Sequence, residues 1–407
     1  MAKEKVVLAY SGGLDTSIMI RWLIETYDYE VIAVCANLGQ AEELDGLEAK
    51  AKNSGASKVY VEDLQDEWVQ EYIYPTLRAL AIYESKYLLG TSMARPLIAK
   101  RQVEIAEKEG AQAVAHGATG KGNDQVRFEI AYMALNPDLK IVAPWKDPNW
   151  TLTSREDCEA YAAKWNIPIQ RRDPKASPYS EDRNLWHISH EGLELEDPGN
   201  EAQDSVFTIS KTLADANDSP EYVEIGFEEG SPCSVNGKAL SPLEILQTLN
   251  KIGADHAIGQ LDMVENRLVG IKSRGVYETP GGTLLYEALR QLEQLVLDRD
   301  TMRTRNQLAI QYAELVYDGK WFSPLRESLD AFFTDMQQHS TGRVRFKLYK
   351  GNIVPAGTWA DRSMYIMDLA SFSDTELYQQ SDATGFIRLF GLPNKVNGML
   401  NRQGTQS

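Results

Sequence analysis

The residues best suited to chemistry form a short loop near the start of the chain, Ser11-Gly12-Gly13-Leu14-Asp15-Thr16-Ser17. Its two glycines let the backbone turn tightly and approach a ligand, and N–H groups at the start of a following helix attract an anion. The hydroxyls of Ser11, Thr16 and Ser17 add donors. The Asp15 carboxylate would repel a bare phosphate, so it favours a polyphosphate that carries Mg²⁺. The loop lacks the lysine of the G-x-x-x-x-G-K-[ST] pattern, which argues against a P-loop kinase or GTPase.

The elements around this loop predict an α/β fold. Continuous apolar runs, typical of strands buried on both faces, occupy residues 6–10, 31–36, 58–61, 111–116 and 139–143. Helical patterns occupy 17–27, 41–53, 64–82, 93–109 and 123–135. Strands that alternate with helices pair in parallel through right-handed crossovers. We therefore expect a doubly wound parallel five-stranded sheet, Rossmann-like, with ligands at the carboxyl ends of its strands.

The pattern changes in the second half of the chain. Thr153-Ser154-Arg155-Glu156 reads as a capping box that opens a helix over 154–165. Alternating strands at 222–227 and 343–349, with long helices between them, predict an α+β domain with antiparallel strands. Those helices are expected near 242–252, 283–299, 302–317 and 323–337. We expect a nucleotide-binding domain over 1–168, the α+β domain over 169–361, and a C-terminal arm over 362–407 with a helix at 374–380 and a Gly/Asn-rich tail.

Composition excludes several classes of protein. The 407 residues carry a net charge of −17, which argues against broad capture of nucleic acid or anionic membranes. No apolar run reaches the ~18 residues of a membrane span, and the N-terminus is too short for a signal peptide. Cys35, Cys158 and Cys233 lie far apart, which argues against a thiolate zinc site and favours the cytoplasm. His187 and His190, three apart in a segment without helical pattern, are a weak zinc signal.

The loop also carries a resemblance. Ser-Gly-Gly-x-Asp-Thr-Ser is similar to the pyrophosphate-binding loop, or PP-loop, of N-type ATP pyrophosphatases, which cleave ATP to AMP and pyrophosphate. Within that group the chain resembles the argininosuccinate synthase family over nearly all of its length. The further motifs that carry this resemblance lie at 87–96 (YLLGTSMARP), 116–129 (HGATGKGNDQVRFE), 179–189 (YSEDRNLWHIS) and 265–278 (ENRLVGIKSRGVYE).

The resemblance implies ATP-dependent ligation of L-citrulline and L-aspartate to argininosuccinate, through a citrulline adenylate, in arginine biosynthesis. Mg²⁺ would arrive with ATP, and the protein would hold no metal of its own. The residues implied for ATP are Ala9, Tyr10, Ser11, Gly12, Gly13, Leu14, Asp15, Thr16, Ser17, Ala36 and Gly117. Those implied for citrulline are Tyr87, Ser92, Asn123, Arg127, Ser180, Ser189, Glu265 and Tyr277, and those for aspartate are Thr119, Asn123 and Asp124.

Two carboxylates are the expected catalytic residues. Asp15 would organise Mg²⁺ and the loop, and Asp124 would orient the amine of aspartate or accept its proton. Arg95, near Tyr87 and Ser92, suits a carboxylate or ureido group. Arg127 lies one helical turn beyond Asn123, on the same face, where it could hold a carboxylate in a bidentate fork.

Other interpretations share part of this pattern. A tRNA-modifying thiolase or a lysidine-type synthase would use the same loop, but would need a nucleic-acid surface. A glutamine-fed synthetase would need a separate glutaminase, and an ATP sensor would bind the nucleotide without turnover. The resemblance further implies a homotetramer held by the C-terminal arm, without nucleic-acid or membrane partners. Asp382–Ile387 matches the pattern of that arm, whereas the Gly and Pro content of 391–398 disfavours a helix there.

Overall fold

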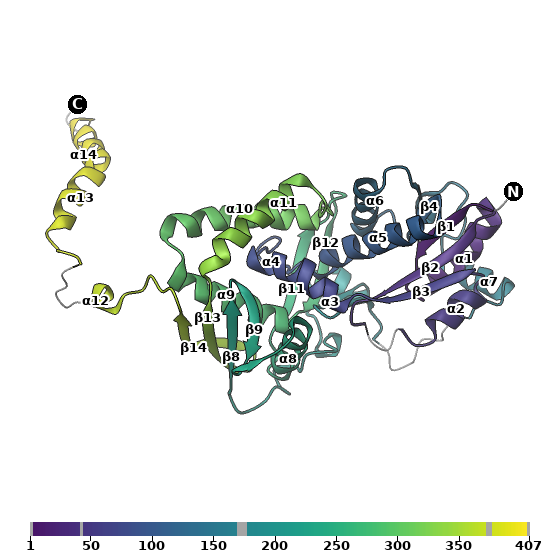
Figure 1. Cartoon of the computed structure of the whole chain (residues 1–407), viewed down its shortest axis with the longest axis horizontal. Coiled ribbons are helices and arrows are strands. Elements are labelled where there is room, and N and C mark those ends of the chain that lie inside the picture. Colours follow the sequence, from purple (N-terminus) through teal and green to yellow (C-terminus); the bar gives the residue numbers. More distant parts are fainter. Residues whose placement is uncertain (1–2, 41–43, 169–176, 372–376, 405–407) are drawn as a thin grey trace. The chain divides into compact units, whose positions relative to one another are not determined.

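The computed structural model describes residues 3–40, 44–168, 177–371 and 377–404. The chain forms two compact units, Met1–Asp361 and Arg362–Ser407 (Figure 1). None of the described helices has the length and apolar character that a membrane crossing requires.

The first unit contains the predicted five-stranded parallel sheet, in the order β3-β2-β1-β4-β5. All four pairings are parallel, which confirms the predicted doubly wound class. The strands are β1 (Lys5–Ala9), β2 (Glu30–Asn37), β3 (Lys58–Asp63), β4 (Ala113–Ala115) and β5 (Lys140–Val142). The chain runs outward from β1 to β3 and then returns to place β4 on the other side of β1. Such a reversal of strand order opens a crevice at the carboxyl ends of the two strands.

Helices cover both faces of this sheet (Figure 1). Because side chains alternate along a strand, Val6 and Leu8 pack into the core on one face and Val7 into the core on the other. The first core contains side chains from α1 (Leu14–Tyr27), α2 (Leu47–Asn53) and α7 (Arg155–Lys164). The second contains side chains from α5 (Gly90–Glu109) and α6 (Asp124–Leu135).

A third and larger core joins the remaining elements of the first unit. It includes the N-terminal half of α5, helices from the second half of the chain, and two antiparallel sheets with the orders β10-β9-β8-β13-β14 and β11-β12-β7-β6. The strands are β6 (Ser180–Arg183), β7 (Ile188–Glu191), β8 (Glu221–Glu228), β9 (Ser231–Val235), β10 (Lys238–Ala239), β11 (Gln260–Asn266), β12 (Lys272–Glu278), β13 (Gly342–Tyr349) and β14 (Asn352–Ala360). The helices are α8 (Pro242–Asp255), α9 (Pro280–Val296), α10 (Arg299–Tyr317) and α11 (Pro324–Met336).

Three predicted helices differ in detail. The one expected over 64–82 is split into α3 (Gln65–Trp68), a π-helical turn (Val69–Ile73) and α4 (Tyr74–Arg78). The π turn ends two residues before Pro75, which has no N–H to continue an α-helical ladder. Of the helix expected over 41–53, residues 41–43 lie outside the described residues and α2 begins only at Leu47. The capping box of α7 consists of Ser154 and Asp157 rather than Thr153 and Glu156.

The second unit corrects the expectation for the tail. Residues 372–376 lie outside the described residues and 377–380 are not helical, so the structure does not support a helix at 374–380. The unit instead contains α12 (Met367–Ala370), α13 (Asp382–Phe390) and α14 (Leu392–Gly404). The expectation that 391–398 is not helical is wrong, because α14 covers all but the first of these residues. Gly391 ends α13 and Pro393 stands in the first turn of α14, where both are tolerated, whereas Gly398 lies inside α14.

Candidate active site

The glycine loop turns from β1 into α1 with a geometry that only glycine permits. Gly12 has a φ of +78°, and a Cβ atom at this position would lie 2.1 Å from Leu47 Cδ2. Gly13 precedes the first turn of α1 and accepts a hydrogen bond from Ser17 Oγ at 2.8 Å. Ser17 Oγ also lies 3.1 Å from the Tyr10 hydroxyl, so both hydrogen bonds of this side chain are made to neighbouring protein groups. Ser11 Oγ and Thr16 Oγ1, 3.1 Å apart, remain at the edge of a cavity.

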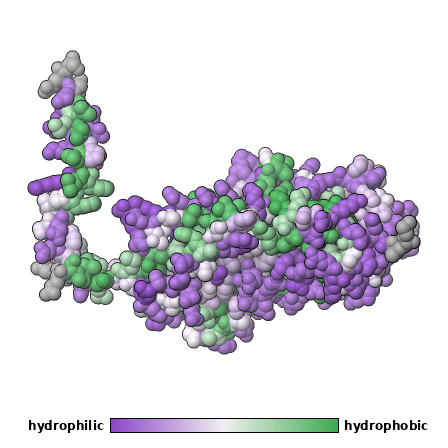
Figure 2. All heavy atoms as spheres, turned by 45° about the horizontal axis from the view of Figure 1, so that its top comes forward, coloured by the Kyte–Doolittle hydropathy of each residue, from purple (hydrophilic) through white to green (hydrophobic). Residues whose placement is uncertain are grey.

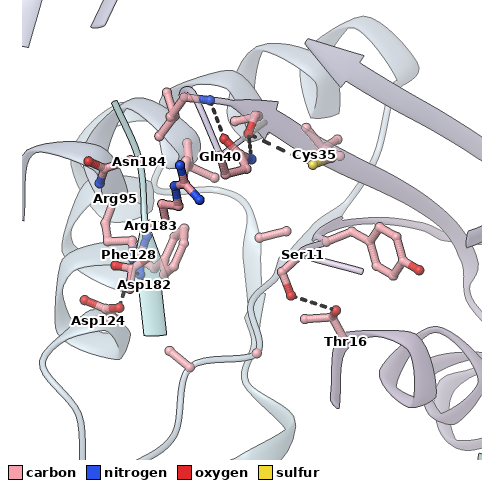
Figure 3. A pocket seen from close by; sticks show the side chains of 18 of the residues that line it. Ser11, Thr16, Cys35, Gln40, Arg95, Asp124, Phe128, Asp182, Arg183 and Asn184 are labelled. Carbon is pink, nitrogen blue, oxygen red and sulfur yellow. Dashed lines mark hydrogen bonds and ion pairs between the residues drawn. The ribbon is translucent and has the colours of Figure 1, made fainter. Parts of the chain in front are cut away.

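This cavity of about 310 Å³ lies at the carboxyl ends of β1, β2 and β4. The hydroxyls of Ser11 and Thr16 line it on the side of the glycine loop (Figure 3), and Gly117 also lines it. Its apolar lining consists of Ala9, Tyr10, Val34, Cys35, Ala36, Leu38, Leu47, Ile98, Ala118 and Phe128. An apolar slot beside an anion-binding loop suits a nucleotide, with the base in the slot and the phosphates at the loop.

A second opening of about 480 Å³ lies beside the same loop. Gly13, Leu14, Asp15 and Thr16 line it from the start of α1, and Thr153, Ser154 and Arg155 line it from the start of α7. Asp15 is exposed to solvent. The protein atoms around its carboxyl nevertheless reduce its hydration and raise its pKa, and the positive charge of Arg155 opposes this rise. Arg155 donates through Nε to Glu159 Oε1 at 2.8 Å. In the sequence, Arg155 is part of a helix-cap pattern, and no local signal indicates its place at this opening.

A polar cavity of about 320 Å³ receives most of the predicted amino-acid-binding residues. The structure brings residues together from the loop before α5, from α6 and the loop before it, and from the single antiparallel sheet β11-β12-β7-β6. They are Tyr87, Thr119, Asn123, Asp124, Arg127, Ser180, Ser189, Glu265 and Tyr277. Ser92 is the exception, because its side chain is fully buried and does not line the cavity. Its neighbour Thr91 does, and donates to Asp182 Oδ2 at 2.8 Å.

Arg95 makes ion pairs with two carboxylates that line this cavity. Its Nε donates to Asp124 Oδ2 at 2.8 Å, and its terminal nitrogen to Asp182 Oδ2 at 2.7 Å. Arg127 donates to the other oxygen of Asp124, Oδ1, at 2.9 Å. Burial alone would raise the pKa of Asp124, but the two guanidinium groups outweigh it and hold that pKa below its usual range. Asp124 is therefore a fixed anion with both oxygens occupied.

Glu265 provides negative charge on another wall of the polar cavity. Tyr317 donates to its Oε1 at 2.9 Å, and Tyr277 to its Oε2 at 3.2 Å. Burial raises the pKa of Glu265, while the Tyr317 hydrogen bond and the charge of Arg127 oppose the rise. A cavity with a guanidinium and a carboxylate complements the carboxylate and ammonium groups of an α-amino acid.

The two predicted histidines have separate protein partners. His187 Nε2 lies 3.1 Å from Thr91 Oγ1, and burial lowers the pKa of His187 to about 4, so the ring is neutral at pH 7. His190 lies between Glu181 and Glu278, with nitrogen–oxygen distances of 3.0 Å to each. Among the described residues, no group of three or more His, Cys, Asp or Glu side chains could hold a metal ion.

The nucleotide cavity and the polar cavity adjoin. Both are lined by Arg95, Gly117, Ala118, Asp124 and Asp182. In Figure 3 the Arg95, Asp124 and Asp182 side chains gather across the cavity from Ser11 and Thr16. A group held in the polar cavity can therefore reach a nucleotide whose phosphates lie at the glycine loop.

A parallel sheet with a glycine and hydroxyl loop after β1, next to an amino-acid-sized polar cavity, defines a HUP-type ATP-using enzyme similar to the N-type ATP pyrophosphatases. Residues 5–168 match the family model described as "Arginosuccinate synthase N-terminal HUP domain", and residues 179–397 match "Arginosuccinate synthase C-terminal domain". The chain belongs to the argininosuccinate synthase family.

Curated relatives agree over nearly the whole length. An argininosuccinate synthase of Carboxydothermus hydrogenoformans is 60% identical over 399 residues, which cover 98% of both chains. One of Desulfitobacterium hafniense is 59% identical over 400 residues, covering 98% of this chain and 99% of the relative. A chloroplastic argininosuccinate synthase of Arabidopsis thaliana is 56% identical over 400 residues, covering 98% of this chain and 80% of the relative.

Proposed function

We propose that this protein catalyses the ATP-dependent ligation of L-citrulline and L-aspartate to argininosuccinate, with release of AMP and pyrophosphate, as a step of arginine biosynthesis. The observation that carries this proposal is the junction of the two cavities at Gly117, Arg95 and Asp124. It allows an amino acid in the polar cavity to react with a nucleotide bound at the glycine loop. The family membership supports the choice of substrates.

The reaction needs two substitutions. The ureido oxygen of citrulline attacks the α-phosphorus of ATP, the bond from that phosphorus to the β-phosphate oxygen breaks, and pyrophosphate leaves. The amine of aspartate then attacks the ureido carbon and loses a proton, while the carbon–oxygen bond breaks and AMP leaves. Adenylation thus turns a poor leaving oxygen into a good one. The protein's part is positioning and charge stabilisation.

We assign the pyrophosphate to the glycine loop and the opening beside it. Backbone N–H groups at the start of α1 would face the leaving group. Mg²⁺ would arrive with ATP, and the exposed Asp15 carboxylate is placed to orient it. Arg155, across the same opening, would add a positive charge that the loop itself lacks.

We assign citrulline to Tyr87, Asn123, Arg127, Ser180, Ser189, Glu265 and Tyr277, and aspartate to Thr119, Asn123 and Asp124. All of these line the polar cavity. Ser92 would act only through the packing of α5, because its side chain is buried. Asp124 would orient the amine of aspartate rather than accept its proton. Both of its oxygens are held by arginines, and a carboxylate whose pKa is held below the usual range is a weak base.

Pyrophosphate release from Mg-ATP tests this function. Citrulline and aspartate are supplied singly and together, and AMP and argininosuccinate are measured alongside. We expect sustained release only with both amino acids, with AMP in equal amount. ATP binding without release under any combination would refute the proposal and favour an ATP sensor. Release only on addition of RNA would favour a tRNA-modifying enzyme.

We also propose a homotetramer held by the arm over 362–407. None of the described residues of this unit is buried, and apolar side chains gather along its helices (Figure 2). Phe386 and Phe390 lie one turn apart on α13 with ring centroids 5.1 Å apart. A repeating exposed apolar stripe of this kind is typical of an interaction surface. Light scattering should show loss of the tetramer in Phe386→Asp but not in the polar control Thr384→Asp.

The division into domains at 168/169 and 361/362 and the cytoplasmic location remain proposals. The ranges of the two family matches support the first boundary, and the compact units support the second. The net charge of −17 supports the expectation that nucleic acid is not a partner.

A further inference from the structure

Tyr317, the last residue of α10, touches three side chains of the polar cavity without lining the cavity itself. Its hydroxyl accepts a hydrogen bond from Asn123 Nδ2 at 2.8 Å and donates one to Glu265 Oε1 at 2.9 Å. Its backbone carbonyl accepts from Arg127 Nε at 2.9 Å. With 1% of its surface exposed, Tyr317 lies behind the site rather than in it.

We propose that Tyr317 is a positioning residue that fixes Asn123, Arg127 and Glu265 for the binding of citrulline. This inference rests on the proposed function. A phenolic oxygen can donate one hydrogen bond while it accepts another, and here each bond goes to a different wall of the cavity, α6 and β11. One atom thus sets the separation between an amide and a carboxylate that are 142 positions apart in the sequence (265 − 123).

Each of the three side chains is oriented by more than one bond. Asn123 Oδ1 accepts from the backbone N–H of Leu268 at 2.9 Å, so the Tyr317 hydroxyl fixes the opposite edge of the amide. The guanidinium of Arg127 lies over the Tyr317 ring, with Cζ 4.8 Å from the centroid, in addition to its bond to the carbonyl. Glu265 takes its second bond from Tyr277.

The hydroxyl also has an electrostatic effect on Glu265. A carboxylate can bind the ammonium group of an amino acid only while it is ionised, and burial raises its pKa toward the neutral form. A donated hydrogen bond stabilises the ionised form. The titratable and charged groups that act on Glu265 from the surrounding elements are Tyr83, Tyr87, Arg127, Glu191, Tyr277 and Tyr317. Removal of the Tyr317 donor should therefore raise the pKa of Glu265 further.

The ring of Tyr317 has a separate structural role. It stacks on Tyr83 with centroids 3.6 Å apart and planes 6° apart. Tyr317→Phe keeps this stacking, the contact with Arg127 and the backbone carbonyl, and removes only the hydroxyl. The substitution thus separates positioning of the cavity from packing of the core.

The test compares Tyr317→Phe with Tyr312→Phe in the full-length protein. Tyr312, on the same helix, is buried and donates to Asp330 Oδ1 at 2.5 Å, away from the polar cavity. We expect Tyr317→Phe to raise the KM for citrulline about tenfold, equivalent to about 1.4 kcal/mol, with less than a twofold change in the KM for ATP and for aspartate. We expect Tyr312→Phe to lower Tm without a change in any KM. When kcat/KM for citrulline is plotted against pH, its fall on the acidic side should occur at a higher pH in Tyr317→Phe than in the native protein. The fall should not move in Tyr312→Phe.

A double-mutant cycle keeps the inference testable if Tyr317→Phe also loses stability. If the hydroxyl acts through Glu265, its removal should raise the citrulline KM less in a Glu265→Gln background than in the native protein. Equal effects in the two backgrounds, or an unchanged citrulline KM, would overturn the positioning role. An unmodified protein that forms no argininosuccinate would instead refute the proposed function, so the two failures are distinguishable.

Discussion

Substitution of Arg127 by lysine gives the sharpest test of the polar cavity. A guanidinium has five N–H donors. In the structure one of them goes to the Tyr317 carbonyl and one to Asp124 Oδ1, at 2.9 Å each, which leaves three for a ligand. A lysine ammonium has three donors in all, so after the same two partners it has one left. A ligand carboxylate held by two N–H donors of Arg127 would thus keep only one in the lysine variant and lose one charge-assisted hydrogen bond.

The expected effect follows from that count. A hydrogen bond to a charged group contributes about 1.5–3 kcal/mol, which corresponds to a rise of about 10- to 150-fold in the citrulline KM. Because the charge is retained, and the nucleotide cavity is not lined by Arg127, the KM for ATP should change less than threefold. Initial rates of pyrophosphate release, with one substrate varied and the others saturating, measure both quantities.

Arg101→Lys is the matched control. Arg101 lies on α5 and makes three ion pairs, with Glu62 and Glu67 at 2.9 Å each and with Glu104 at 3.0 Å. It lines neither the nucleotide cavity nor the polar cavity. We expect this variant to keep every KM within twofold. If Arg127→Lys instead impaired ATP alone, or left the citrulline KM unchanged, the assignment of Arg127 to citrulline would be wrong.

Three further outcomes are expected. Asp15→Asn should reduce pyrophosphate release at least about 100-fold with Tm unchanged, because it removes the exposed charge that we propose to orient Mg²⁺; unchanged turnover would remove Asp15 from the mechanism. Arg155→Gln should raise the KM for ATP about fivefold, as expected for one charge-assisted contact, and leave the citrulline KM as it is; an effect on citrulline would place Arg155 elsewhere. Burial opposes ionisation of Glu278, but His190 and the N–H groups of Thr208 and Ser210 outweigh it and hold its pKa below its usual range. The contribution of ionised Glu278 to the free energy of unfolding should therefore be complete above about pH 4.3, the pKa of a glutamate in the unfolded chain. It should be lost as the pH falls through the lower pKa of Glu278 in the folded protein. Melting curves from pH 3 to 7 should show a smaller acid loss in Glu278→Gln than in the native protein, and equal losses would contradict this account.

The sheet and its ligand loops could be predicted because their signals are local. A strand covered by helices on both faces must be apolar throughout, as in residues 31–36, and a strand–glycine–helix transition fixes where an anion can bind. The start of α5 was less predictable, because the helical pattern indicates 93–109 whereas the helix begins at Gly90. Thr91 and Arg95 are four residues apart and share the face that meets the cavity, whereas Ser92 lies about 100° away around the helix and points into the core.

The contacts of Tyr317 could not be predicted in this way. They depend on the end of α10 reaching α6 and β11, and the hydrogen-bond partners are up to 194 residues away in sequence. No local pattern distinguishes such a tyrosine from any other aromatic residue that ends an amphipathic helix. The ion pairs of Arg95 with both Asp124 and Asp182 are of the same kind, because they join residues from three separate elements.

These tertiary contacts bear on the type of catalysis. Adenylation by ATP supplies the activation of the ureido carbon, so the protein needs alignment more than a strong acid or base. The polar atoms of the cavity fit this requirement: both oxygens of Asp124, both oxygens of Glu265 and both ends of the Asn123 amide are held by other protein atoms. A side chain held in this way loses its orientation when the holding atom is removed. Loss of the Tyr317 hydroxyl should therefore weaken citrulline binding, as loss of a direct contact would. The reaction at the α-phosphorus should not change.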